Sequence, residues 1–159
     1  MAGFKQIVRR VPGFSGYSDA RHRRRSDRAL RQFVAARIDR IVSDLQVAAK
    51  SASQTLAAEI GDVIDDLESI RCDLGQADRD YAGFFADCAW DRVDVLGPVY
   101  ARDEQIVETL VVLSVSIEEG NFTPPHLGRE VRHLHRTLSE RSNAILTLAQ
   151  GGALHCDSS

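Results

Sequence analysis

The side chains best suited to chemistry in this chain are arginines gathered near its N-terminus. Residues 21–28 read RHRRRSDR and contain Arg21, Arg23, Arg24, Arg25 and Arg28. Guanidinium groups stay charged and present a planar fork of donors that fits carboxylates and phosphates. On a helix these side chains surround the axis, and a helix that is polar on all sides does not pack on an apolar core. We therefore predict that the stretch projects past the folded body or meets acidic groups, and that it binds an anionic partner.

The charge of the chain is divided between two parts. Residues 1–40 hold eleven Lys or Arg and three Asp, a net charge of +8, and the remainder holds nine basic and twenty acidic residues, −11, which gives the overall −3. Such a basic head fits the acidic body of the same or a neighbouring molecule, an anionic membrane surface, or a nucleic-acid backbone. We favour the first. Nucleic acid ranks last because the body is acidic and the basic segment lacks interleaved aromatic residues.

Patterns for catalysis or metal binding are weak. Glu130 and His133 match the Glu-x-x-His pair of di-iron bundles, but a helical wheel turns His133 toward solvent and a second, inward-facing pair is missing. An exposed acidic face is the favoured interpretation of Asp62, Asp65 and Asp66. No phosphate-binding glycine loop, nucleophile elbow or zinc-protease motif is present. We predict that the protein is not an enzyme and that it has no catalytic residue, metal, cofactor or small-molecule substrate.

An apolar face near the N-terminus is a second candidate for contact with a partner. A short helix there would place basic residues on one side and four apolar residues on the other: Phe4, Ile7, Val8 and Val11. An amphipathic segment of this kind can insert into a membrane surface or into a partner protein.

A third candidate is a cluster of aromatic residues in mid-chain. It consists of Tyr81, Phe84, Phe85 and Trp90. The favoured interpretation is a plug at one end of the folded body. The alternative is an exposed anchor for a protein partner, because aromatic side chains are enriched at the centres of interfaces.

Helices must position all these groups, because helical periodicity dominates the sequence. Apolar residues recur at steps of three, four or seven over residues 30–45, 56–74, 96–117 and 127–148, and Asp103 interrupts the third stripe at a core-spaced position. This spacing is typical of bundle and coiled-coil seams. It predicts an all-α fold, an antiparallel four-helix bundle built of long helical hairpins. Alternatively, two helices of one chain pair with those of a second copy.

The predicted organisation has three parts. Residues 1–17 form the amphipathic segment and a linker, residues 18–150 form the bundle, and residues 151–159 form a disordered tail after Gly151-Gly152. Near residues 49–53 we favour a hairpin capped by Ser51 or Ser53 over one continuous helix from 18 to 75, which would span roughly 85 Å. The third long helix is predicted over residues 99–119 with a cap at Gly120-Asn121, and the fourth starts at residues 123–125.

Cysteine usage and hydropathy predict where the protein resides. Three cysteines without a CxxC spacing indicate a reducing compartment. The longest apolar run, Leu110–Leu113, is too short to cross a bilayer, and no apolar run follows Arg9-Arg10 as a secretory signal requires. We predict a cytoplasmic protein, with peripheral attachment to the inner face of the membrane as the alternative.

Two stretches have a recognisable pattern, RRVPGFSGYSDARHRRRSDRALR near the N-terminus and DYAGFFADCAWDRVDVLGPVYARD in mid-chain. They resemble a family of small uncharacterised bacterial helical proteins, in which a Val-Pro-Gly-x-x-Gly-Tyr segment precedes an Arg-rich helix and a Tyr-Ala-Gly-Phe-Phe segment lies in mid-chain. The resemblance implies a helical bacterial protein and brings no activity. The plan is also similar in organisation to membrane-remodelling proteins of the phage-shock type. We predict a non-catalytic bundle that acts through protein–protein contacts and associates with itself.

Overall fold

The computed structural model of the chain describes residues 2–76, 81, 83–85 and 93–156. These residues form helices and no strand, so the predicted all-α fold is confirmed. The helices are α1 (Ala2–Arg10), α2 (Ala20–Lys50), α3 (Gln54–Leu74), α4 (Val93–Glu118) and α5 (Pro124–Cys156).

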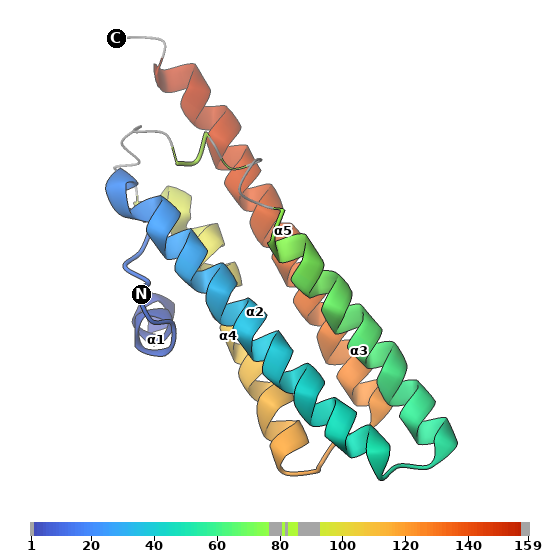
Figure 1. Ribbon diagram of the computed structural model, residues 1–159. Helices are drawn as coiled ribbons and strands as arrows, with labels where there is room; N and C mark the ends of the chain where they lie inside the picture. The colour runs from blue at the N-terminus through green and yellow to red at the C-terminus, as the bar shows by residue number, and fades with distance from the viewer. Residues whose placement is uncertain (1, 77–80, 82, 86–92, 157–159) are drawn as a thin grey trace.

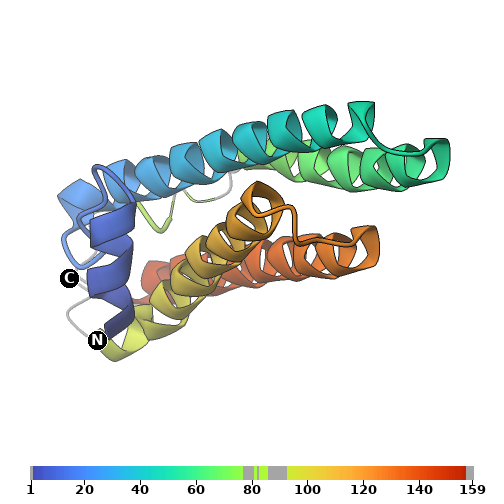
Figure 2. The same ribbon diagram turned by 90° about the horizontal axis from the view of Figure 1, so that it is seen from below.

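The four long helices form two stacked hairpins. Consecutive long helices run in opposite directions, as the predicted antiparallel bundle requires (Figure 1). The α2–α3 hairpin lies on the α4–α5 hairpin, with α2 against α4 and α3 against α5 (Figure 2). The pairs α2/α5 and α3/α4 therefore occupy the diagonals. The short α1 crosses one end of the bundle and packs against α4.

The core follows the predicted apolar stripes. In α2, all five members of the stripe are buried: Leu30, Val34, Ile38, Ile41 and Leu45. The other three helices contribute buried aliphatic residues at the same spacing, among them Ile60, Leu67, Leu110 and Leu134. Burial of these side chains is the main force that holds the hairpins together.

Polar caps separate α2 from α3. The Asp19 side chain accepts from the Arg21 amide at the start of α2, and the Ser53 hydroxyl accepts from the Leu56 amide at the start of α3. Ser51 lies at the C-cap of α2. The predicted hairpin is therefore correct, and a continuous helix is excluded. Side-chain oxygens at these positions satisfy amides that have no partner within the helix.

The predicted end of α4 is correct, whereas the predicted end of α5 is not. Gly120 has φ +66°, and the Asn121 amide donates to the Ser116 carbonyl oxygen at 2.9 Å, which is the predicted glycine cap. The predicted end of α5 at Gly151-Gly152 is wrong, because the helix runs through both glycines to Cys156. Glycine lowers helix propensity by only about 1 kcal/mol and does not end a helix unless it takes a left-handed conformation.

Candidate functional site

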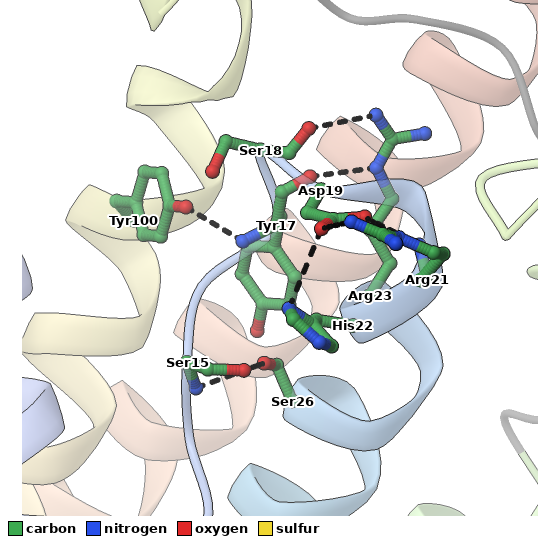
Figure 3. Close-up of polar contacts among 9 residues, drawn as sticks. All are labelled: Ser15, Tyr17, Ser18, Asp19, Arg21, His22, Arg23, Ser26 and Tyr100. Atoms are coloured by element: carbon green, nitrogen blue, oxygen red, sulfur yellow. Dashed lines mark hydrogen bonds and ion pairs between the residues drawn. The ribbon is translucent and has the colours of Figure 1, made fainter.

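The linker between α1 and α2 carries Tyr17 into the interior of the bundle. Gly16 has φ +92°, and a Cβ atom there would lie 2.9 Å from both the Phe4 ring and the Tyr100 hydroxyl. Glycine permits this backbone and this approach. Tyr17 itself is fully buried, and its amide donates to the Tyr100 hydroxyl oxygen at 2.7 Å (Figure 3). The Gly16-Tyr17 pair of the linker thus places one phenol side chain among the helices.

Arg23 differs from the other arginines at the start of α2 because it is fully buried. Its Nε donates to the Tyr17 carbonyl oxygen at 2.6 Å and its Nη2 to that of Ser18 at 3.5 Å (Figure 3). Its guanidinium also lies 5.9 Å from the centre of the Phe84 ring. The prediction that this stretch contains no core residue is therefore wrong for Arg23. Linker carbonyls, which periodicity does not reveal, replace the water that the guanidinium loses, so Arg23 is not available to an external anion.

Beside Tyr17 lies a set of buried polar groups that we call the core ion cluster: Tyr17, Asp27, Asp103 and Arg141. Arg141 of α5 donates from Nε to Asp103 of α4 at 2.5 Å and from Nη2 to Asp27 of α2 at 2.8 Å. The Tyr17 hydroxyl donates to the other oxygen of Asp103 at 2.6 Å and accepts from Arg141 at 2.9 Å. None of the four residues is more than 2% exposed. One guanidinium thus ties the linker, α2, α4 and α5 together.

The surroundings shift the pKa values of Tyr17, Asp103 and Arg141 in this cluster. Burial, followed by the negative charge of Asp103, raises the pKa of Tyr17 well above its ordinary value, so the phenol stays protonated. Burial also raises the pKa of Asp103, against the opposing attraction of Arg141. Burial alone would lower the pKa of Arg141, but Asp103, Tyr17 and Asp27 outweigh it and hold that pKa well above its ordinary value. The groups satisfy one another, which is the arrangement of a structural network.

A cavity of about 110 Å³ adjoins the cluster between α2, α3 and α5. On its wall, Arg31 donates from Nε to Asp27 at 2.8 Å, and the Tyr81 hydroxyl lies 2.6 Å from the Ser142 hydroxyl. Much of the remaining wall is aliphatic and includes Leu30, Val34, Ile70 and Leu138. Arg31, Tyr81, Arg141 and Ser142 on this wall are all engaged with protein partners, so these four groups serve the packing beside the ion cluster.

The mid-chain aromatic residues pack inward. Tyr81 and Phe84 are buried, and the Phe84 ring centre lies 5.5 Å from that of Tyr17. Phe85 is half-buried beneath Arg24, whose guanidinium lies 4.7 Å from the ring centre. These three side chains occupy the position of the plug, and the predicted Trp90 lies outside the described residues.

The apolar face of α1 is used within the molecule. Ile7 and Val11 are buried, and Phe4 is half-buried with its ring centre 5.5 Å from that of Tyr100. Val8 is 42% exposed. Of the four residues predicted to insert into a membrane or a partner, only Val8 is therefore presented at the surface.

Four arginines at the start of α2 form an exposed surface that we call the arginine surface: Arg21, Arg24, Arg25 and Arg28. Arg21 forms an ion pair with Asp19 at 2.8 Å, and Arg24 stacks on Phe85. Within the described part of the chain, no carboxylate lies at ion-pair distance from Arg25 or Arg28. The residues predicted to bind an anion thus divide into one core residue and four surface residues.

Net charge alternates from helix to helix around the bundle. It is +6 for α2 (nine basic, three acidic), −5 for α3 (one and six), −4 for α4 (one and five) and +2 for α5 (four and two). Because α2 and α5 each pack against α3 and α4, every packed pair of long helices combines opposite charges. Ion pairs cross these seams from Arg71 to Asp39, from Arg40 to Glu118 and from Arg102 to Glu140. They use arginines outside the arginine surface.

The histidines and carboxylates considered for a metal site stay apart. His133 lies on α5 with its Nδ1 2.9 Å from Arg136 Nη2. Among the described residues, no group of three His, Cys, Asp or Glu side chains is placed to hold a metal ion. Of the helices that the structure describes, none has both the length and the hydropathy needed to cross a membrane.

Sequence reasoning missed most of the core ion cluster, although a signal was present. Asp27, Asp103 and Arg141 each stand three residues before or after an apolar member of their own helix's core stripe and four from another core residue. Two acidic residues and one basic residue at core-spaced positions on three different helices predict a buried ion pair. Tyr17 gave no such signal, because it lies in a linker without periodicity.

Comparison of the chain with protein-family models, with curated proteins and with solved structures gives no match. A buried ion cluster fixes the end of the bundle, and on the same helix an arginine surface faces outward.

Proposed function

We propose that the protein is a non-catalytic helical bundle that acts through protein–protein contacts in a bacterial cytoplasm and associates with itself. The arginine surface carries the proposal. Arg25 and Arg28 are exposed and lack an ion-pair partner among the described residues. They lie on α2, which the buried side chains of Arg23 and Asp27 anchor to the rest of the bundle. Fixed cations on a rigid helix favour encounter with an acidic partner and set its orientation.

A second copy of the chain offers a suitable acidic surface. All six acidic side chains of α3 are exposed, and none lies at ion-pair distance from a cation in the described part of the molecule: Glu59, Asp62, Asp65, Asp66, Glu68 and Asp73. Each molecule thus has an excess of cations on one helix and of anions on the next, which supports contact between copies.

The core ion cluster supports a non-catalytic role. A general base or nucleophile needs a reactive atom that substrate can reach. Asp103 and Arg141 instead engage each other and Tyr17, and all three are buried. These groups serve the fold, and the exposed arginines remain for contact.

Light scattering over a range of protein and salt concentrations tests the proposal. We expect a mass above the monomer's 17.6 kDa at low salt, and a decline toward the monomer at high salt because exposed charges are then screened. A monomer mass at every protein concentration at low salt would reject self-association.

The alternative proposal is that α1 binds a membrane surface. It requires Ile7 and Val11 to leave the core, since both are buried. Flotation with anionic liposomes tests it, with the exposed Lys5, Arg9 and Arg10 replaced by glutamine, because deletion of α1 would also remove core residues. If the parent protein floats with the liposomes and the variant does not, membrane binding is favoured over self-association.

A further inference from the structure

The outer face of the α2–α3 hairpin carries charges of both signs, in matching positions, that have no ion-pair partner among the described residues. At 100° per residue, Arg25 on α2 and Asp65 on α3 each lie about 180° from the core direction of their own helix. Arg28 and Glu68 each lie about 120° from it, on the edges of α2 and α3 that face each other. All four side chains are exposed. The hairpin thus presents two cations and two anions on one surface.

A concavity of about 290 Å³ lies between α2 and α3 on this face. Arg28, Arg31 and Arg71 line it, together with Gln32 and Leu74. Arg71 is engaged with Asp39, while Arg28 has no ion-pair partner within the residues that the structure describes. We call this concavity the arginine concavity. Its chemistry fits a carboxylate, which a guanidinium binds through paired hydrogen bonds.

The positions of these charges along the hairpin are set by contacts between its helices. Arg31 donates to the Leu74 carbonyl oxygen, and Arg71 pairs with Asp39. Arg25 and Arg28 therefore lie beyond the C-terminal end of α3, and Asp65 and Glu68 lie nearer the α2–α3 turn. A half turn about an axis that lies in the plane of the face, passes between these two levels and runs perpendicular to the line joining cations to anions places the cations of one copy opposite the anions of the other.

We propose that two copies of the chain pair through this face about such a two-fold axis, so that Glu68 of each copy enters the arginine concavity of the other and Asp65 meets Arg25. In a two-fold interface every contact occurs twice, so one charge pattern provides both halves of the interface. This inference rests on the proposed self-association and names the surface and the occupant.

Charge reversal tests the pairing, because reversals on the two surfaces compensate each other. The variants Arg25→Glu/Arg28→Glu and Asp65→Lys/Glu68→Lys each place like charges at both contacts of a homodimer. We expect each to weaken dimerisation about 100-fold or more at low salt. An equimolar mixture of the two variants should restore the dimer, since both contacts are then attractive. The four-fold variant should also dimerise, and it keeps the net charge of the parent.

The control reverses two exposed arginines on another helix, Arg129→Glu/Arg132→Glu, and changes net charge as much as the first variant does. Dimerisation should persist in this control, and circular dichroism should show unchanged helix content in all variants. If the parent and every variant dimerise with equal affinity, the proposed pairing is wrong and self-association must use another surface. A monomeric parent would reject both proposals. If a double variant fails to fold, failure of the four-fold variant to dimerise while folded would equally overturn the pairing.

Discussion

Arg23 and Arg25 stand two residues apart on α2 and meet opposite surroundings. Arg23 is fully buried on the carbonyl oxygens of Tyr17 and Ser18, whereas Arg25 is exposed and has no ion-pair partner within the described chain. A second buried arginine, Arg141, donates hydrogen bonds to the carboxylates of Asp103 and Asp27. Among the described residues, a guanidinium therefore enters the core where fixed oxygen acceptors replace its water.

The two sets of arginine should therefore affect different measurements. Removing a buried charge leaves its partners unsatisfied and lowers the free energy of unfolding. Removing an exposed charge has little effect on stability but changes association. The following variants test this division, in order of decreasing expected effect.

Arg141→Ala should have the largest effect on stability. It leaves Asp27 and Asp103 buried without their shared counter-charge, which should lower the free energy of unfolding by about 3–5 kcal/mol. Denaturant unfolding followed by circular dichroism measures this. Arg136→Ala, on the exposed side of the same helix, is the matched control and should change stability by less than about 0.5 kcal/mol. Equal effects of the two replacements would show that the core ion cluster does not hold the helices together.

Replacing the charges together sharpens that result. Arg141→Met combined with Asp27→Leu and Asp103→Leu removes the desolvation cost along with the ion pairs, so part of the stability lost in Arg141→Ala should return. The return is partial because the Tyr17 hydroxyl and Arg31 lose the carboxylates that they contact. Denaturant unfolding again provides the measurement. A triple variant as unstable as Arg141→Ala would indicate that shape, and not unpaired charge, dominates at this site.

Arg23→Ala should come next. It leaves the Tyr17 and Ser18 carbonyl oxygens without this donor and should cost about 2–3 kcal/mol. Arg25→Ala is the control on the same turn of α2 and should change stability little while weakening self-association. If Arg25→Ala destabilises the fold as much as Arg23→Ala, the division between the two arginines is wrong.

Tyr17→Phe should cost about 1–2 kcal/mol at neutral pH, because Asp103 and Arg141 lose one hydrogen-bond partner. The pKa of Tyr17 is raised in the folded protein, so its contribution is present below the unfolded pKa near 10 and is lost as pH rises above it. Thermal melting from pH 8 to 11 should therefore show a shallower alkaline decline in Tyr17→Phe than in the parent. Parallel declines would contradict the buried, protonated phenol.

The smallest effect concerns Asp19, the half-buried cap of α2. Hydrogen bonds from the Arg21 side chain and amide lower the pKa of Asp19 to about 2. Its charged form therefore supports the helix above the ordinary pKa of 3.8, and this support is lost as pH falls toward 2. A carboxyl NMR titration should place the midpoint near 2 in the parent and closer to 3.8 in Arg21→Ala.

The arrangement of helices around the bundle shows how charge and topology agree. With α2 and α5 on one diagonal and α3 and α4 on the other, like-charged helices are kept apart. An arrangement with α2 beside α5 would bring together two helices with net charges of +6 and +2. Charge thus disfavours the alternative packing of the same four apolar stripes.

Local sequence patterns are sufficient to predict the long helices, their core faces and the turns between them. These depend on local spacing and on caps such as Asp19, Ser53 and Gly120, which act within a few residues of the chain. Which charged residues enter the core depends on tertiary contacts. Asp103 and Arg141 are buried because the linker tyrosine and residues on other helices, 38 to 124 positions away, supply their partners. Arg23 is buried because the linker folds back and places the Tyr17 and Ser18 carbonyl oxygens, six and five positions earlier in the chain, against its guanidinium.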